Sequence, residues 1–421
     1  MATLESMDSK ASSERRAFFS DLSLPAATAG FVAVLVGFTS TIALVFQAAL
    51  AFGATPAQIA SWIGALGLGM GLCSALPSLW LKKPVMVAWS TPGAAVLAAG
   101  GLAGGFTLGE ATGAFMVSAA LMVLFGMTGW FEKILKIIPP ALAAALLAGV
   151  LTRFALQTFT AAQTALPLVL SMLAAYCIGR RWLPRYAVVL TLAVGLVLLA
   201  VQGRLALPTS LSAGGWLQAL AIPEFVAPVF SFQAFFSLAL PLFVVTMASQ
   251  NLPGAAAITT AGYGPESANG GIPVSKIITL TGLVTLFLAP FGAFSLGLAA
   301  ITAAMCMGPQ VDSDPARRYT AAVCCGFLYV LTGVFGGAVA LLLAAFPAEF
   351  IAAIAGLALL GTIASALQSA MQHEAHREAA LITFLVTLSG VVLGGIGSAF
   401  WGTAAGLAAL LIAQVPPWVR R

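Results

Sequence analysis

The sequence predicts an all-α polytopic membrane protein, because it is strongly apolar, nearly free of charge and rich in small residues. Of its 421 residues, 61% are hydrophobic and 7% are charged, whereas about 25% of residues are charged in a typical soluble domain. So few charged side chains cannot cover a water-exposed surface, and lipid must cover much of it. The 43 glycines fit this class, because small residues let helices approach closely within a membrane.

Apolar stretches of about 20 residues, the length needed to cross a bilayer core of about 30 Å, recur along the chain. We predict fourteen spans in two groups of seven. The first group is expected near residues 25–51, 57–79, 84–101, 110–130, 138–159, 163–180 and 186–203. The second group is expected near residues 232–252, 272–289, 290–307, 319–346, 348–369, 378–396 and 398–415.

These spans divide the chain into two repeats, a linker and two tails. The predicted segments are a cytoplasmic tail over 1–22, a first repeat over 23–204, an interfacial linker over 205–231, a second repeat over 232–415 and a cytoplasmic tail over 416–421. The N-terminal residues lack the apolar core and cleavage site of a secretory signal. Because each repeat has an odd number of spans, related halves would form an inverted repeat.

The basic residues give an independent test of the count, because cytoplasmic loops are enriched in Lys and Arg. With the N-terminus inside, sixteen of the 18 basic residues lie on the cytoplasmic side. These are Lys10, Arg15, Arg16, Lys82, Lys83, Lys133, Lys136, Arg180, Arg181, Arg185, Lys276, Arg317, Arg318, Arg377, Arg420 and Arg421. Only Arg153 and Arg204 fall outside. The pattern favours fourteen spans with both termini in the cytoplasm.

The third and tenth spans are short and interrupted by Pro and Gly. Val85–Trp89 is β-prone, and Ser90 or Thr91 could cap a helix that begins at Pro92. Phe291–Ser295 also predicts an extended stretch, with Ser295 as a cap. Non-helical backbone at membrane depth must face protein or a wet cavity. Two helix N-termini meeting there would attract an anion, although two ligand-free kinks would give the same pattern.

A polar run closes the eighth span, Met247-Ala-Ser-Gln-Asn-Leu-Pro-Gly254. These residues could simply end a helix at the interface, or Ser249, Gln250 and Asn251 could hydrogen-bond a carboxylate or a ring in a central cavity. Gln47 occupies the similar position in the first span of the first half. Phe294 could stack on an aromatic substrate, because it adjoins the tenth-span break.

The same polar run resembles the signature of the benzoate membrane transport family, the BenE-type benzoate:proton symporters. Residues 19–31 and 88–95 are similar to that family too, and the resemblance runs from about residue 19 to 415. It implies import of an aromatic carboxylate with protons, and the uracil-permease fold with core and gate domains, often as a homodimer. In that fold, the substrate site would correspond to Ser90, Thr91, Pro92, Gly93, Ser249, Gln250, Asn251, Ser295, Leu296 and Gly297.

Nucleobase permeases of this architecture place carboxylates in the eighth and tenth spans, and this chain has none there. A neutral amide suits an anionic substrate better, because a carboxylate would repel it. The coupled proton could therefore travel on the substrate, or through Glu110 or His373 at a span edge; the sequence does not choose between them.

Several other classes are disfavoured. The sequence has no P-loop for nucleotide-driven transport, and its basic residues are scattered rather than gathered in a nucleic-acid-binding surface. His373 and His376 lie one residue short of the zinc-protease spacing, so we expect no metal and no cofactor. A passive anion channel, or a transporter of another organic anion or a nucleobase, stays open as an alternative. A membrane enzyme is disfavoured, because no cluster of His, Asp or Glu falls within the spans.

Overall fold

The computed structural model describes residues 18, 20–129, 140–204, 219–264, 267, 271–309, 311–393 and 396–414. Most of the two predicted tails and part of the predicted linker lie outside these residues. The predicted cytoplasmic position of the termini therefore stays a prediction.

The first half consists of long helices with one break at the predicted third span. Its elements are α2 (Leu24–Ala51), α3 (Pro56–Leu81), β1 (Val87–Trp89), α4 (Thr91–Gly104), α5 (Leu108–Thr128), α7 (Pro140–Ala161), α8 (Leu166–Trp182), the 3-10 turn η1 (Pro184–Tyr186) and α9 (Ala187–Val201). Capping boxes start two of these helices, Thr55 with Gln58 at α3 and Thr107 with Glu110 at α5. Each box satisfies backbone N–H groups that have no partner inside the helix.

The second half begins with one long helix that contains three π-helical turns. This helix comprises α11 (Phe232–Ala234), η3 (Phe235–Ala239), α12 (Leu240–Val245), η4 (Thr246–Asn251), α13 (Leu252–Ile258) and η5 (Thr259–Tyr263). The elements that follow are α14 (Val274–Leu288), the 3-10 turn η6 (Ala289–Phe291), β2 (Leu296–Leu298), α15 (Ile301–Met307), α16 (Tyr319–Val334), α17 (Gly336–Ala345), α18 (Ala348–Met371), the 3-10 turn η7 (Glu374–His376), α19 (Arg377–Ser389) and α20 (Ser398–Gln414).

Three predictions about the second half were wrong in detail. The helix of the eighth span does not end at Pro253 but continues to Tyr263. The predicted span 319–346 is two helices, α16 and α17, bent by 63°. The extended stretch of the tenth span lies at Leu296–Leu298 rather than at 291–295, because η6 and a turn at Gly292 precede it.

Seven of the described helices are long and apolar enough to cross a membrane, and the bent pair α16–α17 would make an eighth. Several shorter apolar helices, including α4, α9 and α20, accompany them. The structure is therefore a helical membrane protein, and the count of fourteen spans stays a prediction.

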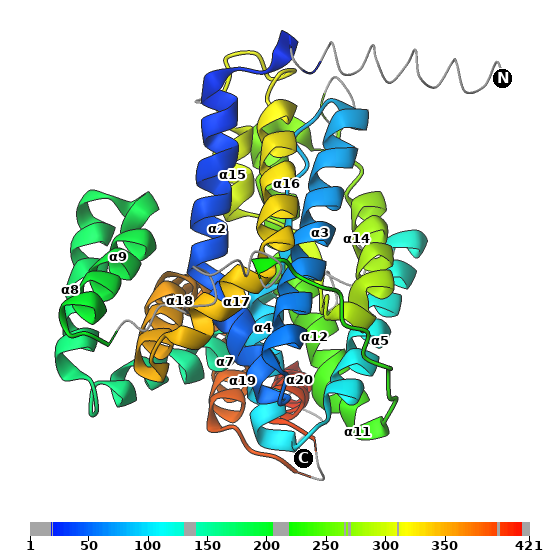
Figure 1. Cartoon of the computed structure of the whole chain (residues 1–421). Helices are drawn as coiled ribbons and strands as arrows, with labels where there is room; N and C mark the ends of the chain where they lie inside the picture. Colours follow the sequence, from blue (N-terminus) through cyan, green and yellow to red (C-terminus); the bar gives the residue numbers. More distant parts are fainter. Residues whose placement is uncertain are drawn as a thin grey trace.

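The helices pack as two groups, whose members are labelled in Figure 1. In one group, α2 and α3 stand beside α16, and α5 packs on α14. In the other, α7 packs on α18 and α19, α19 packs on α20, and the hairpin of α8 and α9 stands at one side. Contacts between α2 and α18 and between α4 and α7 join the two groups.

The two interrupted segments cross as a pair of short strands within the first group. β1 pairs antiparallel with β2, so that Val87 faces Leu298, Ala88 faces Gly297 and Trp89 faces Leu296. Two further backbone bonds extend the pairing, one from the Ser90 N–H to the Ser295 carbonyl (2.9 Å) and one from the Ala299 N–H to the Met86 carbonyl (2.9 Å). Segments more than 200 residues apart in the sequence thus meet at one point.

Glycines let α3 and α16 pack closely against each other. A side chain at Gly67 would place its Cβ 2.5 Å from the Gly333 Cα, and one at Gly71 would place it 2.6 Å from the Gly326 carbonyl oxygen. These are backbone atoms, so an added side chain could be accommodated only by moving one helix away from the other. Small residues are required here because the two backbones touch.

We therefore expect Gly67→Ala to destabilise the fold by about 1–2 kcal/mol, since overpacking a tight contact usually costs that much or more. Thermal unfolding of the purified protein in detergent checks this. Leu68→Ala is the matched control, because Leu68 is exposed in the structure and should unfold near the wild-type temperature. An unchanged melting temperature for Gly67→Ala would contradict the contact between the backbones.

Candidate substrate-binding site

The crossing of β1 and β2 must satisfy its backbone polar groups from side chains, because non-helical backbone is costly at membrane depth. On the β1 side, α3 supplies two serines. The Val87 N–H donates to the Ser74 hydroxyl (3.0 Å) and the Val85 N–H donates to the Ser78 hydroxyl (2.9 Å). The Ser74 hydroxyl also donates to the Val87 carbonyl (3.3 Å), whereas the Ser78 hydroxyl lies nearer to the Ser74 carbonyl (2.6 Å) than to the Val85 carbonyl (3.2 Å). Each serine thus provides a hydrogen bond that a neighbouring strand would otherwise provide.

On the β2 side, Asn251 and Thr285 have the same role. The Leu298 N–H donates to the Asn251 side-chain oxygen (2.8 Å), and the Leu296 N–H donates to the Thr285 hydroxyl (3.2 Å). Asn251 is fully buried. Its oxygen is therefore committed to the backbone of β2 rather than to a ligand.

A buried chain of three hydroxyls ties the crossing to η4. Ser295 donates to Thr246 (3.0 Å), and Thr246 donates to Ser90 (2.9 Å). Ser90 in turn caps α4, because its hydroxyl accepts from the Gly93 N–H at 3.0 Å. Of the two candidate caps, Ser90 and Thr91, it is Ser90 that caps this helix. The prediction that Ser295 caps the second helix was wrong, because Ala300 is the N-cap of α15 and Ser295 bonds Thr246 instead.

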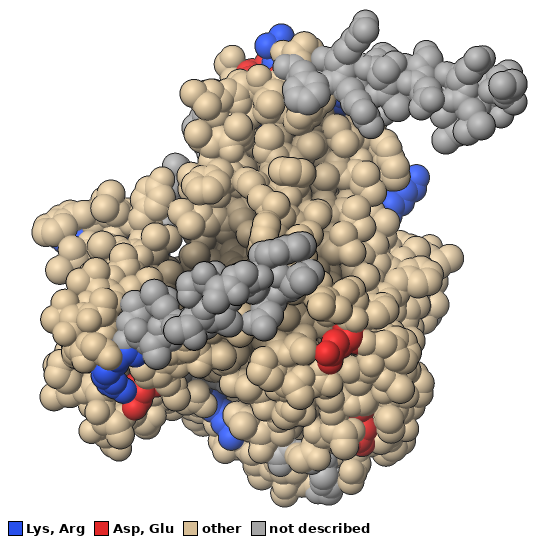
Figure 2. All heavy atoms as spheres, in the orientation of Figure 1, with Lys and Arg blue, Asp and Glu red and all other residues tan. Residues whose placement is uncertain are grey.

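A cavity of about 790 Å³ lies between the two groups of helices, beside the crossing. This volume is within the range of about 300–1,000 Å³ that small-molecule sites occupy. Figure 2 shows the surface hollowed near its centre and carrying few charged side chains. Residues from both groups line the cavity, chiefly from α2, β1, the start of α4, η4 and α15 on one side and from α7, α8 and α18 on the other.

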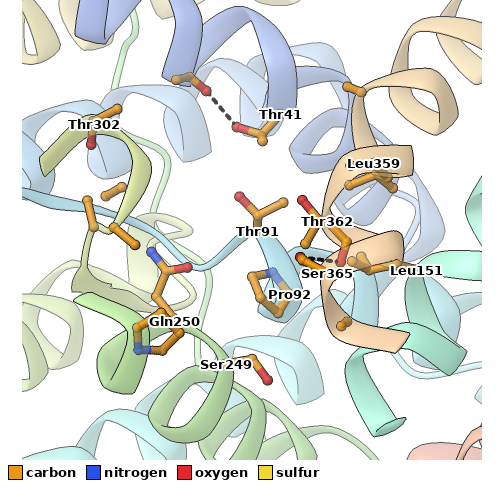
Figure 3. Close-up of a pocket in the computed structure, with 18 of the residues that line it drawn as sticks. Thr41, Thr91, Pro92, Leu151, Ser249, Gln250, Thr302, Leu359, Thr362 and Ser365 are labelled. Carbon is orange, nitrogen blue, oxygen red and sulfur yellow. Dashed lines mark hydrogen bonds between the residues drawn. The ribbon is translucent and has the colours of Figure 1, made fainter. Parts of the chain in front are cut away.

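The cavity is largely apolar, and apart from Arg180 its polar lining groups are uncharged. Thr91 and Pro92 bring the N-terminus of α4 to its wall, and Ser249 and Gln250 come from η4. Figure 3 shows the Gln250 amide pointing into the space toward Thr91. Within the part of the chain that the structure describes, no hydrogen bond occupies the side chains of Thr91, Ser249 and Gln250. They are available to a ligand.

The π-helical turn η4 explains how Gln250 reaches the cavity. Pro253 has no N–H, so the Ser249 carbonyl loses its normal donor four residues on. The helix adjusts by a wider turn, in which the Leu252 N–H donates to the Met247 carbonyl five residues back. Such π-turns often occur at functional sites, and here the turn carries both Ser249 and Gln250.

The described residues that line the cavity include no Asp, Glu, His or Lys, and their one formal charge is Arg180. Arg180 is exposed near the end of α8, where Ser365 and Ser369 of α18 also line the wall. The cavity thus has a neutral end at Gln250 and a cationic mouth at Arg180.

Four of the twelve residues predicted for the site line the cavity: Thr91, Pro92, Ser249 and Gln250. The other eight do not line it. Ser90, Gly93, Asn251, Ser295, Leu296 and Gly297 belong to the crossing and its supports. Phe294 is fully buried against Trp62 and Phe115, so it is not free to stack on a ligand. Gln47 is half-buried on α2 away from the lining.

Sequence reasoning missed the part of the wall that comes from other helices. Thr41 of α2 accepts a hydrogen bond from the Trp89 indole (2.9 Å) and shapes the wall beside β1. On α18, Thr362, Ser365 and Ser369 lie on one face and line the cavity. Their spacing of three and four residues is the signal that could have found them, since it puts them on one side of a helix.

The chain is similar to known membrane transport proteins over nearly its whole length. A family model described as "Benzoate membrane transport protein" matches residues 20–412. The "Inner membrane protein YdcO" of Escherichia coli is 46% identical over 382 residues, which cover 91% of this chain and 94% of that protein. The "Benzoate membrane transport protein" of Acinetobacter baylyi is 39% identical over 396 residues, 94% and 97% of the two chains.

The fold also has a solved relative. The transmembrane domain of a cyanobacterial bicarbonate transporter, BicA, aligns with a TM-score of 0.52 and 16% identity, over 93% of this chain and 97% of that one. At this identity the likeness concerns the fold alone. Together with the sequence matches, it shows a membrane transporter fold and not an enzyme. The chain therefore belongs to the benzoate membrane transport protein family.

Proposed function

We propose that this protein imports benzoate, or a closely similar aromatic carboxylate, together with protons across the bacterial inner membrane. The observation that carries the proposal is the chemistry of the cavity. Its walls are largely apolar, as an aromatic ring requires, and its polar end presents Gln250, Ser249 and the start of α4 without a carboxylate among the described lining residues.

The carboxylate would bind at the neutral polar end. The N-terminus of a helix carries about half a positive charge, and α4 points this end at the cavity through Thr91 and Pro92. The Gln250 amide can donate to the same carboxylate. The ring would then lie against the apolar side chains of Leu147, Leu151 and Leu359 on the facing helices.

Among the described residues that line the cavity there is no Asp, Glu or His to carry the coupled proton. Glu110 accepts from the Thr107 N–H in the capping box of α5 (3.0 Å), and His373 precedes η7; neither lines the cavity. We therefore propose that benzoate binds as the anion and that its carboxylate takes up the coupled proton before the cavity opens to the other side, so that the substrate crosses as the neutral acid. A neutral acid also crosses the apolar part of the route at lower cost than its anion.

The finer architecture that we propose has fourteen spans in two inverted repeats of seven, forming a core domain and a gate domain. Two features support it. The interrupted third segments of the two halves pair antiparallel as β1 and β2, and the helices pack in two groups with the cavity between them. Movement of one group against the other, as an elevator or by rocking, would open the cavity to each side in turn.

Uptake of labelled benzoate into proteoliposomes, with and without an inward proton gradient, tests the proposal. Because benzoic acid itself crosses lipid, protein-free liposomes under the same gradient provide the background rate. We expect a saturable initial rate well above that background, with accumulation that depends on the gradient. Saturable uptake that only equilibrates benzoate across the membrane, at a rate independent of the proton gradient, would indicate a passive channel or uniporter instead of a symporter. Uptake equal to the background would refute transport of benzoate.

A further inference from the structure

Arg153 is a basic residue within a predicted span, and the proposed function does not use it. It lies on α7 and is half-buried. The ion pairs among the described residues join Arg204 with Glu349, Arg317 with Asp314 and Arg377 with Glu374. Arg153 forms none with any residue that the structure describes. A charge without a counter-ion at membrane depth is costly and usually marks a functional position.

Arg153 lines a second, small cavity. Its volume is about 20 Å³, which is room for roughly one water molecule. Three hydroxyl residues line it from three different elements, Ser237 of η3, Thr387 of α19 and Ser398 of α20. The Thr387 hydroxyl is buried and has no hydrogen-bond partner within the described part of the chain. Arg153 is thus surrounded by neutral residues, mostly apolar, with three hydroxyl residues among them.

This second cavity continues the line of the main one. On α4, Thr91 and Pro92 line the main cavity, whereas Val96, Ala99 and Gly100 line the second. From Pro92 to Ala99 the helix rises by about 10 Å, at about 1.5 Å per residue. On α7, Leu151 lines the main cavity and Arg153 lines the second. The two cavities therefore lie one after the other along the seam between α4 and α7.

The two arginines lie at opposite ends of this line. Arg180 is near the end of α8, where its guanidinium approaches Gly361 of α18. Arg153 is near the other end of α7, where its guanidinium packs against Gly390 at the end of α19. The cavity at the Arg180 end of the seam has a volume of about 790 Å³, whereas the cavity at the Arg153 end has a volume of about 20 Å³.

We propose that Arg153 receives the substrate's carboxylate at the end of the route that is closed in this structure. This inference rests on the transport function proposed above. When that end opens, the seam between α4 and α7 exposes the guanidinium with Ser237 and Ser398 beside it. Arg180 has the same role at the open end. Each mouth then carries one guanidinium, and the neutral site at Gln250 lies between them, so that the anion is attracted at either face and held tightly at neither.

The two faces can be measured separately in intact cells and in inverted vesicles prepared from the same cells. We expect Arg153→Gln to raise the KM for benzoate about tenfold on one face only, which corresponds to about 1.4 kcal/mol. Arg180→Gln should raise KM on the opposite face, by about threefold because this side chain is exposed. Arg181→Gln is the matched control, since Arg181 is exposed beside Arg180 and does not line the cavity, and it should change neither face.

A purely structural role gives a different pattern. If Arg153 only anchors α7 to the end of α19, Arg153→Lys and Arg153→Gln should lower the melting temperature alike and change both faces equally. The proposal requires that Arg153→Lys keeps KM within about threefold of the wild type, because the charge is retained. Equal effects on both faces, or KM unchanged in Arg153→Gln, would overturn it while wild-type transport continues. A wild-type protein that carries no benzoate would instead refute the proposed function.

Discussion

Gln250→Glu is expected to abolish uptake of benzoate at neutral pH, with kcat/KM falling by about a thousandfold. The substitution keeps the size of the side chain but places a carboxylate where the Gln250 amide faces the start of α4. Two like charges about 4 Å apart repel by about 4 kcal/mol at an effective dielectric constant of about 20, and about 4 kcal/mol corresponds to about three powers of ten. Initial rates of labelled uptake, compared at equal amounts of folded protein, measure the loss.

The pH dependence of the same variant separates charge from shape. Burial and a neighbouring anion both raise the pKa of a carboxyl group. The pKa of the introduced glutamate should therefore lie above the usual value of about 4.3, and its carboxylate should be protonated at a correspondingly higher pH. Uptake by Gln250→Glu should therefore recover as the pH falls, relative to the wild type. Gln250→Leu is the control without charge, and it should lose about tenfold at every pH. Equal losses in both variants would mean that no anion binds beside residue 250.

Asn251→Ala is expected to damage the fold rather than the binding chemistry. Its side-chain oxygen accepts from the Leu298 N–H at 2.8 Å, and alanine would leave that buried donor without a partner. An unsatisfied buried donor costs about 1–3 kcal/mol. We expect a lower melting temperature together with a loss of transport, because β2 would no longer be held against β1.

Gln250→Ala provides the comparison for Asn251→Ala, since the two residues are neighbours on one turn. It should weaken transport while its melting temperature stays near that of the wild type, because the Gln250 amide lies in the cavity wall and not in the crossing. If the two variants changed in the opposite way, with Gln250→Ala unstable and Asn251→Ala stable but inactive, the assignment of the two amides would be wrong.

This difference between neighbours shows how far the sequence could predict the site. The polar run 247–254 indicated that the eighth segment contributes to a functional region, and the structure places Ser249 and Gln250 in the cavity wall. The sequence could not tell which amide faces the cavity. That depends on the π-turn at Thr246–Asn251, in which each residue is rotated about the helix axis by less than in a regular α-helix.

The interrupted segments were predictable for a similar reason and to a similar extent. Pro and Gly around residues 83–93 indicated the break, and Ser90 caps α4 as predicted. The tenth segment was harder, because η6 places Gly292 in a left-handed conformation with φ of 101° and shifts the strand by several residues. The antiparallel pairing of β1 with β2 depends on contacts between residues far apart in the chain, which local patterns do not encode.

The wall from α18 could not be assigned from composition alone. Thr362, Ser365 and Ser369 look like ordinary small residues of an apolar span, and only their packing opposite η4 makes them part of a cavity. Phe294 shows the opposite error, because its place beside the break suggested a role in binding. It fills the aromatic cluster with Trp62 and Phe115, where it supports the crossing from behind.

The position of bound substrate tests the central claim most directly. The structure to determine is that of the protein with 4-iodobenzoate, in which anomalous scattering locates the iodine. The iodine and the carboxylate lie at opposite ends of the ring, so the position of the iodine also fixes the direction of the carboxylate. We expect the carboxylate between Thr91 and Gln250, and the iodine on the side of Leu147 and Leu359. A ligand that bound outside this cavity, or that directed its carboxylate away from the start of α4, would contradict the account.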